Sequence, residues 1–326
     1  MAAIETEKLR REFKGGIVAV DGVDLSVEEG EVFGFLGPNG AGKTTTVRML
    51  TTLLRPTSGR ARVAGFDVAR EQHAVRRSIG VALQEAGLDA LASGRELLEL
   101  QGRLFGMSAA EAKSRAVDLL ELVGLTDAAD RQVKTYSGGM KRRLDLASAL
   151  VHGPRILFLD EPTEGLDPAS RQAVWAEVQR LNRQMGMTVF LTTHYLEEAD
   201  RLAGRLAIID HGRIVAEGTP ESLKAAIGSD VVTVAVNREG LEVARSLLAN
   251  TDGLRDIQAD DAGLTLFVEN GTQAVAQVVR LLDSAGVPVG PVAVSRPSLD
   301  EVFLKATGSR LEGAESAVGG AQNGNR

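Results

Sequence analysis

Short runs of apolar residues recur along the chain, and longer stretches with apolar residues at helical spacing separate them. Residues 156–159, 189–192 and 206–209 are three such runs, each long enough for one buried strand. Strands that alternate with helices favour a mainly parallel sheet with helices packed on it. The pattern therefore predicts an α/β core.

The N-terminal part has a different pattern. Residues 17–20 and 23–27 are predicted to be strands of a small antiparallel sheet. Residues 31–36 form an apolar run that predicts a buried strand, which a glycine-rich turn and a helix from about residue 42 to 54 follow. This order predicts a strand, a turn and a helix at the start of the core.

A helical insert is predicted between about residues 88 and 136. Residues 96–103 and 109–123 carry leucines and other apolar residues at helical spacing. No apolar strand pattern interrupts this part of the chain, so we expect it to be set into the α/β core as a separate group of helices.

The composition changes after residue 220, which we take as the end of the first domain, 1–220. We predict a linker at 221–228 and a second domain at 229–308. Its expected elements follow the order β-α-β-β-α-β of a ferredoxin-like fold. They are strands at 231–236, near 257, at 264–268 and at 287–294, with helices at 241–249 and 275–282.

The C-terminal end is expected to close with one helix and a tail. The helix should begin near Ser298, with Glu301 three residues later as in a capping box. The tail at 309–326 has little apolar content, so we predict that it is disordered.

Composition narrows the possible functions. The 326 residues include no cysteine, which excludes disulfides and thiolate chemistry, and the formal net charge is −7, which disfavours nucleic acid as a partner. The charged start predicts no signal peptide, and no apolar run reaches the roughly 18 residues of a membrane span.

A phosphate-binding loop is predicted directly after the first buried strand. Its spacing fits G-x-x-x-x-G-K-[ST], in which glycines turn backbone N–H groups toward phosphate oxygens at the start of a helix. We expect Lys43 to contact the β- and γ-phosphates of a nucleotide and the Thr44 hydroxyl to bind Mg²⁺, with Thr45 beside them. Such a loop also occurs in kinases and GTPases. The run is Gly37-Pro38-Asn39-Gly40-Ala41-Gly42-Lys43-Thr44.

A pair of acidic residues ends another buried strand. Asp160 and Glu161 follow the apolar run at 156–159. A carboxylate in this position can bind the Mg²⁺ that Thr44 holds, and the next residue then lies near the γ-phosphate. We predict Asp160 as a metal ligand and Glu161 as the group that orients or deprotonates the attacking water. The alternative is a solvated acidic turn.

The run Tyr136-Ser137-Gly138-Gly139-Met140 resembles the signature motif of ATP-binding-cassette (ABC) ATPases. The family usually has Leu at the position of Tyr136 and Gln at that of Met140. Ser137 and the amides of Gly138 and Gly139 can form a second phosphate cradle at a helix N-terminus. In the family this cradle closes on ATP held by the opposite subunit, so the resemblance implies an ATP-sandwich dimer with a second copy.

Other positions match the order of the family's motifs. Gln84 resembles the Q-loop glutamine, which reaches Mg²⁺ or the water, and His194 the switch histidine, which contacts the γ-phosphate. Asp167, in Gly165-Leu166-Asp167, resembles part of the D-loop, and Phe13 matches the aromatic residue that stacks on adenine. The resemblance implies that Glu161, His194, Lys43 and Gln84 are catalytic. A surface amide, a structural histidine and a core phenylalanine are the alternatives.

The segment 299–304, Leu-Asp-Glu-Val-Phe-Leu, resembles the C-terminal extension of ATP-binding subunits of the daunorubicin-resistance type. The resemblance implies a P-loop NTPase fold of the ABC nucleotide-binding type with a small C-terminal α+β domain. It also implies a separate integral-membrane permease, a drug, antibiotic or other hydrophobic compound as cargo, and a peripheral position on the cytoplasmic face of the membrane.

Two other functions compete with this interpretation, and a third could exist alongside it. A non-transport ABC ATPase for DNA repair or ribosomes usually has long coiled coils or two cassettes, whereas this chain has one P-loop and no sustained heptads. A small-molecule kinase would have no use for residues 137–139. A ligand-sensing role of residues 229–308 is compatible with transport.

Overall fold

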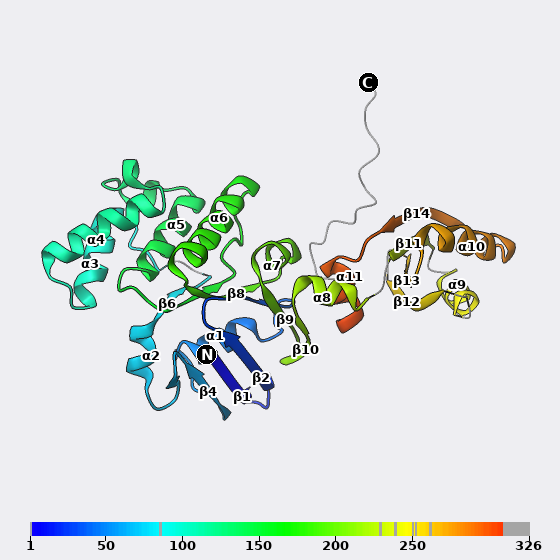
Figure 1. Cartoon of the computed structure of the whole chain (residues 1–326), viewed down its shortest axis with the longest axis horizontal. Coiled ribbons are helices and arrows are strands. Elements are labelled where there is room, and N and C mark those ends of the chain that lie inside the picture. The colour runs from blue at the N-terminus through cyan, green and yellow to red at the C-terminus, as the bar shows by residue number, and fades with distance from the viewer. Residues whose placement is uncertain are drawn as a thin grey trace, which may run out of the picture. The chain divides into compact units, whose positions relative to one another are not determined.

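The computed structural model describes residues 2–84, 87–227, 230–237, 240–249, 251, 253–260 and 263–308. Contacts within the chain divide it into two compact units (Figure 1). The first runs to His194 and resumes over Glu198–Glu217, and the second contains Tyr195–Glu197 and the chain from Gly218 on. The predicted tail, 309–326, lies outside the described residues.

A mainly parallel sheet forms the core of the first unit, in the order β10-β9-β3-β8-β7-β6. Every residue of β3, β7 and β8 is buried, as expected for central strands covered on both faces. The rings of Phe33, Phe35 and Phe158 all pack near Phe190. The strands are β3 (Val32–Leu36), β6 (Ile79–Ala82), β7 (Ile156–Asp160), β8 (Thr188–Thr193), β9 (Arg205–Asp210) and β10 (Arg213–Gly218).

Helices connect these strands and place the ends of the strands at one edge of the sheet. Helix α1 follows β3 and ends at Leu50, with Thr51 as its C-cap. It is therefore shorter than the helix predicted from about residue 42 to 54. The helices are α1 (Lys43–Leu50), α2 (Gln72–Ser78), α5 (Gly138–Ala149), α6 (Pro168–Met185) and α7 (Leu196–Leu202). Parallel strands of this kind bind ligands at their carboxyl ends, so the residues after β3, β7 and β8 define where a site can form.

A second, antiparallel sheet lies near the N-terminus, in the order β2-β1-β4-β5. The prediction of two short strands at 17–20 and 23–27 was wrong, because both belong to the single strand β2 (Val18–Glu28), and its partner β1 (Ala2–Glu12) was missed. Bulges interrupt the pairing of β1, and they break the alternation of buried and exposed residues by which a strand is found. Strands β4 (Ser58–Val63) and β5 (Phe66–Asp67) complete the sheet.

The predicted helical insert contains α3 (Gly94–Leu104) and α4 (Ala109–Leu122), which pack against each other and against α5. Both helices begin with a complete capping box, from Ser93 and Glu96 in α3 and from Ser108 and Glu111 in α4. Two short 3-10 turns, at Thr126–Ala128 and Val133–Thr135, lead from α4 to the start of α5.

The second unit has the predicted β-α-β-β-α-β order. Its antiparallel sheet has the strand order β12-β13-β11-β14, which is the ferredoxin-like arrangement, and one core of valines and leucines joins the sheet to its two helices. The elements are β11 (Asp230–Val236), α9 (Leu241–Leu248), β12 (Leu254–Asp260), β13 (Gly263–Val268), α10 (Gly271–Ser284) and β14 (Val289–Ser295).

Two further helices of this unit pack against each other. Helix α8 (Pro220–Ala225) occupies most of the segment expected to be a linker, and Thr219 caps it. Helix α11 (Leu299–Thr307) begins after Ser298 with the capping box that the sequence predicts, and it contacts α8. Among the described residues no helix is both long enough and apolar enough to cross a membrane.

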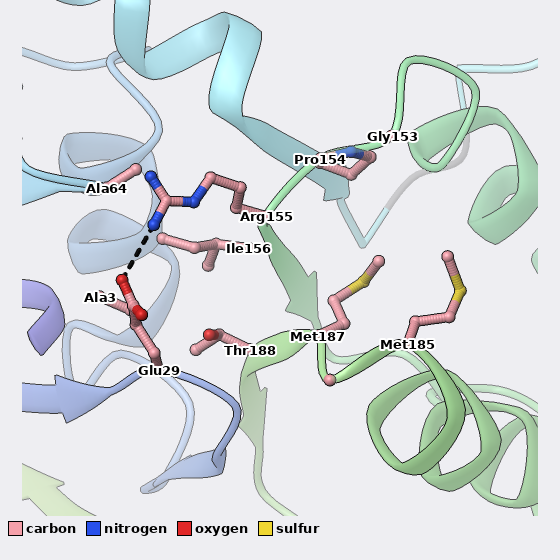
Figure 2. A pocket seen from close by; sticks show the side chains of 11 residues that line it. Ala3, Glu29, Ala64, Gly153, Pro154, Arg155, Ile156, Met185, Met187 and Thr188 are labelled. Atoms are coloured by element: carbon pink, nitrogen blue, oxygen red, sulfur yellow. Dashed lines mark hydrogen bonds and ion pairs between the residues drawn. The ribbon is translucent and has the colours of Figure 1, made fainter. Parts of the chain in front are cut away.

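A hollow of about 280 Å³ lies at the amino-terminal ends of β7 and β8. Figure 2 shows its lining, with an ion pair between Arg155 and Glu29, with Met185 at the end of α6 and with Met187 directly before β8. This is the edge of the sheet opposite to the carboxyl ends of the strands. The candidate catalytic and binding residues lie at the other edge, after the carboxyl ends of β3, β7 and β8.

Candidate functional site

The predicted phosphate loop lies between the end of β3 and the start of α1. Glycine is required at two of its positions, because a Cβ at Gly37 would collide with the backbone oxygen of Ile209 and one at Gly42 with that of Ala19. Gly42 also has φ +108°, a conformation that side chains disfavour. Asn39 and Gly40 lie at the surface, Ala41 is buried, and Pro38, Thr44 and Thr45 are half-buried.

Lys43 is the first residue of α1, and its side chain is 4% exposed. Its ammonium group donates hydrogen bonds to the backbone oxygens of Gly37 at 2.7 Å and Pro38 at 3.1 Å, and it lies 3.1 Å from Oε1 of Glu161. The lysine therefore holds a positive charge inside the loop and links it to the end of β7.

Asp160 and Thr44 meet beside this lysine. The hydroxyl groups of Thr44 and Thr192 donate to Oδ1 of Asp160, at 3.2 Å and 2.6 Å. The other oxygen, Oδ2, is buried and has no hydrogen-bond partner among the described residues. A buried carboxylate oxygen without a partner is costly, so a hydroxyl and an unsatisfied carboxylate together form a donor set that suits a magnesium ion.

The carboxylate of Glu161 lies between the ammonium group of Lys43 and the imidazole of His194. His194, directly after β8, donates from Nδ1 to Oε2 at 2.9 Å, opposite the contact with Lys43. Burial alone would raise the pKa of Glu161, but the hydrogen bond from His194 and the charge of Lys43 outweigh it and lower the pKa to about 2. The carboxylate is thus ionised at neutral pH.

The backbone of Glu161 is also unusual. Its φ of +50° lies in the left-handed region, which is rare for a residue with a side chain and costs about 1 kcal/mol or more. Its amide donates to both the backbone oxygen and the hydroxyl of Thr192, each at 3.1 Å. These bonds to the neighbouring strand hold the residue in this conformation and turn its side chain toward Lys43 and His194.

The signature-like run begins α5. Ser137 caps the helix, and its hydroxyl accepts the amide of Met140 at 3.2 Å. A Cβ at Gly139 would lie only 2.7 Å from Oγ of Ser170 in α6, so this glycine permits close packing of the two helices. Tyr136, where the family usually has Leu, is buried and donates its hydroxyl hydrogen to the Ala128 oxygen at 2.6 Å. The departure from the usual pattern is therefore accommodated inside the helical insert.

Three other predicted residues lie outside the Lys43 group. Gln84 donates to Oε2 of Glu164 at 2.6 Å, and Asp167 caps α6 by accepting from the amide and hydroxyl of Ser170. Phe13 is 38% exposed, which excludes a place in the core, and the guanidinium of Arg11 lies 4.7 Å from its ring centre. The structure thus brings together Lys43, Thr44, Asp160, Glu161 and His194.

Sequence reasoning missed Arg142, a buried charged residue on α5. Its guanidinium donates to three backbone oxygens and contacts Oδ2 of Asp145 at 3.1 Å. A signal in the sequence could have identified Arg142 and Asp145. They are charged residues three positions apart on a helix face that is otherwise apolar. Burial raises the pKa of Asp145 to about 6, although the charge of Arg142 opposes this.

Asp145 should give the folding stability a defined pH dependence. The pKa of its carboxyl is higher in the folded protein, about 6, than its ordinary 3.8, so between these values the folded state binds more protons. Stability should then increase as the pH falls. We expect the unfolding free energy of the wild type, relative to Asp145→Asn, to rise by up to about 2 kcal/mol between pH 7 and pH 4.5.

Urea unfolding across this pH range measures the effect. Asp130→Asn is the matched control, because Arg95 lowers the pKa of the exposed Asp130 and the pH trend should have the opposite sign. A difference between wild type and Asp145→Asn that does not change with pH would contradict the expectation.

Comparisons with known proteins identify the family of the chain. The family described as ABC transporter matches residues 20–164, and the family of DrrA1-3-like ATP-binding protein C-terminal domains matches residues 218–307. The chain is 48% identical to the daunorubicin resistance ATP-binding protein DrrA2 of Streptomyces coeruleorubidus, over 96% of this chain and 98% of that protein. It is 44% identical to the doxorubicin resistance ATP-binding protein DrrA of Mycobacterium tuberculosis, over 94% of each chain.

Solved structures are similar over about two thirds of the chain. The dimeric post-hydrolysis state of the ATP-binding cassette MJ0796, bound to ADP and Pi, is 28% identical with a TM-score of 0.61, covering 66% of this chain and 98% of that one. The ABC fold, the ATPase class and the resemblance to daunorubicin-resistance proteins are thereby confirmed. The chain belongs to the ATP-binding proteins of drug-resistance ABC transporters, and it is a nucleotide-binding ATPase of that family.

Proposed function

We propose that the chain is the ATP-hydrolysing motor of an ABC exporter and energises a separate membrane permease. The observation that carries this proposal is the buried group in which Lys43 and His194 both contact Glu161, beside the pair of Thr44 and Asp160. Phosphoryl transfer to water requires a positive charge that binds phosphate, a carboxylate that can accept a proton from water and oxygen ligands for a metal ion.

In this mechanism the loop at Gly37–Thr44 binds the triphosphate through its amides, and Lys43 contacts the β- and γ-phosphates. Thr44 and Asp160 would hold Mg²⁺, with Gln84 as a further ligand once it leaves Glu164. When bound, the ion neutralises charge on the phosphate oxygens. Adenine would stack on the ring of Phe13, which is exposed.

Glu161 is the proposed base. The hydrogen bond from His194 and the ion pair that Lys43 forms with the other oxygen lower its pKa to about 2, so the carboxylate is a weak base. A γ-phosphate that binds Lys43 would compete for this charge, leaving the Glu161 oxygen to accept a hydrogen bond from the attacking water. Losing the neighbouring cation would also raise its pKa and its basicity. His194 keeps the second oxygen in place and can contact the γ-phosphate.

We propose a second copy of the chain as the partner that completes the site. Ser137, Gly138 and Gly139 stand at the N-terminus of α5, a position whose amides and helix dipole favour an anion. The turn would contact the ATP bound to the other copy, with Asp167 at the same interface. The dimeric state of the similar cassette MJ0796 supports this arrangement.

The permease is proposed to bind the first unit beside Gln84. A hollow of about 310 Å³ there has Leu83, Phe105 and exposed Leu53 in its lining, and the neighbouring Leu104 is 73% exposed. Apolar side chains left in water in this way suit a helix of a membrane subunit. We place the chain on the cytoplasmic face of the membrane and propose an ATPase domain at 1–220, a C-terminal domain at 229–308 and a drug or other hydrophobic compound as cargo.

Replacing Leu104 tests the permease interaction. Leu104→Asp should reduce co-purification of the chain with its permease from detergent-solubilised membranes at least about tenfold, because a charge must then be desolvated at the contact. Val117→Asp, a change at another exposed apolar position, is the control. Recovery of the wild-type chain with ribosomes or DNA, and without a membrane protein, would contradict the proposal and favour a non-transport ABC ATPase.

A further inference from the structure

Arg142 connects the signature helix to the ends of two core strands. Its side chain is 7% exposed, and its guanidinium reaches three backbone oxygens in two separate segments. The oxygens belong to Leu83 at 2.5 Å, Asp160 at 3.2 Å and Pro162 at 2.8 Å. The first directly precedes Gln84, and the other two belong to the residues on either side of Glu161.

The position of these contacts matters because the backbone at Glu161 is strained. A residue held at φ +50° keeps that conformation only when its surroundings restrain it. Thr192 restrains the amide of Glu161 from the side of β8, and Arg142 binds the carbonyls before and after Glu161 from the side of α5. The direction of the catalytic carboxylate thus depends on a side chain of the helix that Ser137 begins.

We propose that Arg142 is a positioning residue for ATP hydrolysis. It transmits the position of the signature helix to Glu161 and Gln84, so that the base is aligned when the Ser137–Gly139 turn of its own chain engages the nucleotide of the second copy. Asp145, on the same helix, holds the guanidinium in the orientation that reaches all three oxygens. This inference rests on the proposed role of Glu161.

Only arginine can make this set of contacts. Its planar guanidinium presents donors in fixed directions, whereas the lysine ammonium is a compact charge at the end of a flexible chain. Lys at this position keeps the buried charge and the pairing with Asp145, but it cannot reach three carbonyls of two segments together. Arg142→Lys therefore separates the alignment of the carboxylate from the electrostatics of the helix.

The test measures ATP hydrolysis by the full-length chain at varied ATP concentrations. Arg142→Lys should lower kcat about 10- to 100-fold, the loss expected when a catalytic group is displaced by around 1 Å. The KM for ATP should stay within about threefold, because the phosphate loop is unchanged. Arg143→Lys is the matched control, since Arg143 is the next residue on α5 and donates to the oxygens of Val123 and Gly124 in the helical insert.

Two outcomes would overturn the inference. One is a kcat of Arg142→Lys within twofold of the wild type. The other is a loss that Arg143→Lys reproduces together with an equal drop in melting temperature, which would indicate a structural role alone. Glu161→Gln measured in parallel separates the two proposals: if it retains full turnover, the proposed base is wrong, whereas an inactive Glu161→Gln beside a fully active Arg142→Lys removes only the role of Arg142.

Discussion

Glu161→Gln should lower the turnover number for ATP at least about 100-fold, within the range that general-base catalysis contributes. Glutamine has the same shape and can adopt the same backbone conformation, but it cannot take a proton from water. The hydrogen bonds that hold the backbone of residue 161, from its amide to Thr192, remain available. The variant should therefore fold normally and lose only the chemical step.

Binding of ATP should survive this change. Lys43 keeps its bonds to the oxygens of Gly37 and Pro38, and it no longer forms an ion pair with residue 161. We expect the dissociation constant for ATP, measured by calorimetric titration, to be equal to or lower than that of the wild type.

Phosphate release measures the turnover number. Glu177→Gln is the matched control, because Glu177 is also a half-buried carboxylate in an ion pair, with Arg180, outside the site. A Glu161→Gln variant that hydrolyses ATP at the wild-type rate would show that another group activates the water.

Lys43→Ala should have the second large effect, on nucleotide affinity. The substitution removes a charged donor from the phosphate loop, and hydrogen bonds to charged groups contribute about 1.5–3 kcal/mol. The dissociation constant for ATP should therefore rise about 10- to 100-fold, with a much smaller change for adenosine, which has no phosphate.

Calorimetric titration with ATP and adenosine measures both affinities. Lys113→Ala, at an exposed position of α4, controls for the loss of a lysine charge in general. An unchanged affinity of Lys43→Ala for ATP would contradict the assignment of the phosphate site.

Glu161→Gln and Lys43→Ala both change the interaction between the carboxylate of residue 161 and its positively charged neighbour. Lys43 and His194 together keep Glu161 ionised inside the protein, in spite of its burial. Removing the lysine leaves the carboxylate with a single partner, so its pKa should rise toward the ordinary range. The carboxylate should still be ionised at neutral pH, so the loss of turnover in Lys43→Ala should come from the missing phosphate contact and not from the base.

The phosphate loop and the acidic strand end could be predicted from the sequence because their chemistry is local. Glycine spacing, the strand before the loop and the helix after it all lie within a short stretch around Gly37–Thr44, and Asp160 and Glu161 directly follow the apolar residues of β7. The order of elements in the second unit was predictable for the same reason, since periodicity and capping residues such as Ser298 act over a few residues.

Pairing between distant segments was not predictable in this way. Strand β1 was missed because its bulges break the alternation on which strand prediction depends, and β2 is a single strand because β1 pairs along its length. Hydrogen bonds between distant strands leave no regular spacing in the sequence, so only the folded sheet reveals them.

The sequence alone determined which residue types are available for the chemistry and in which order the motifs follow. Tertiary structure decided that Lys43, Glu161 and His194 meet in one group, that Gln84 bonds to Glu164, and that Arg142 binds the carbonyls on either side of Glu161. The reason is physical. Burial and long-range hydrogen bonding set the pKa of Glu161 and the direction of its side chain, and both arise only when the ends of separate strands meet at one edge of the sheet.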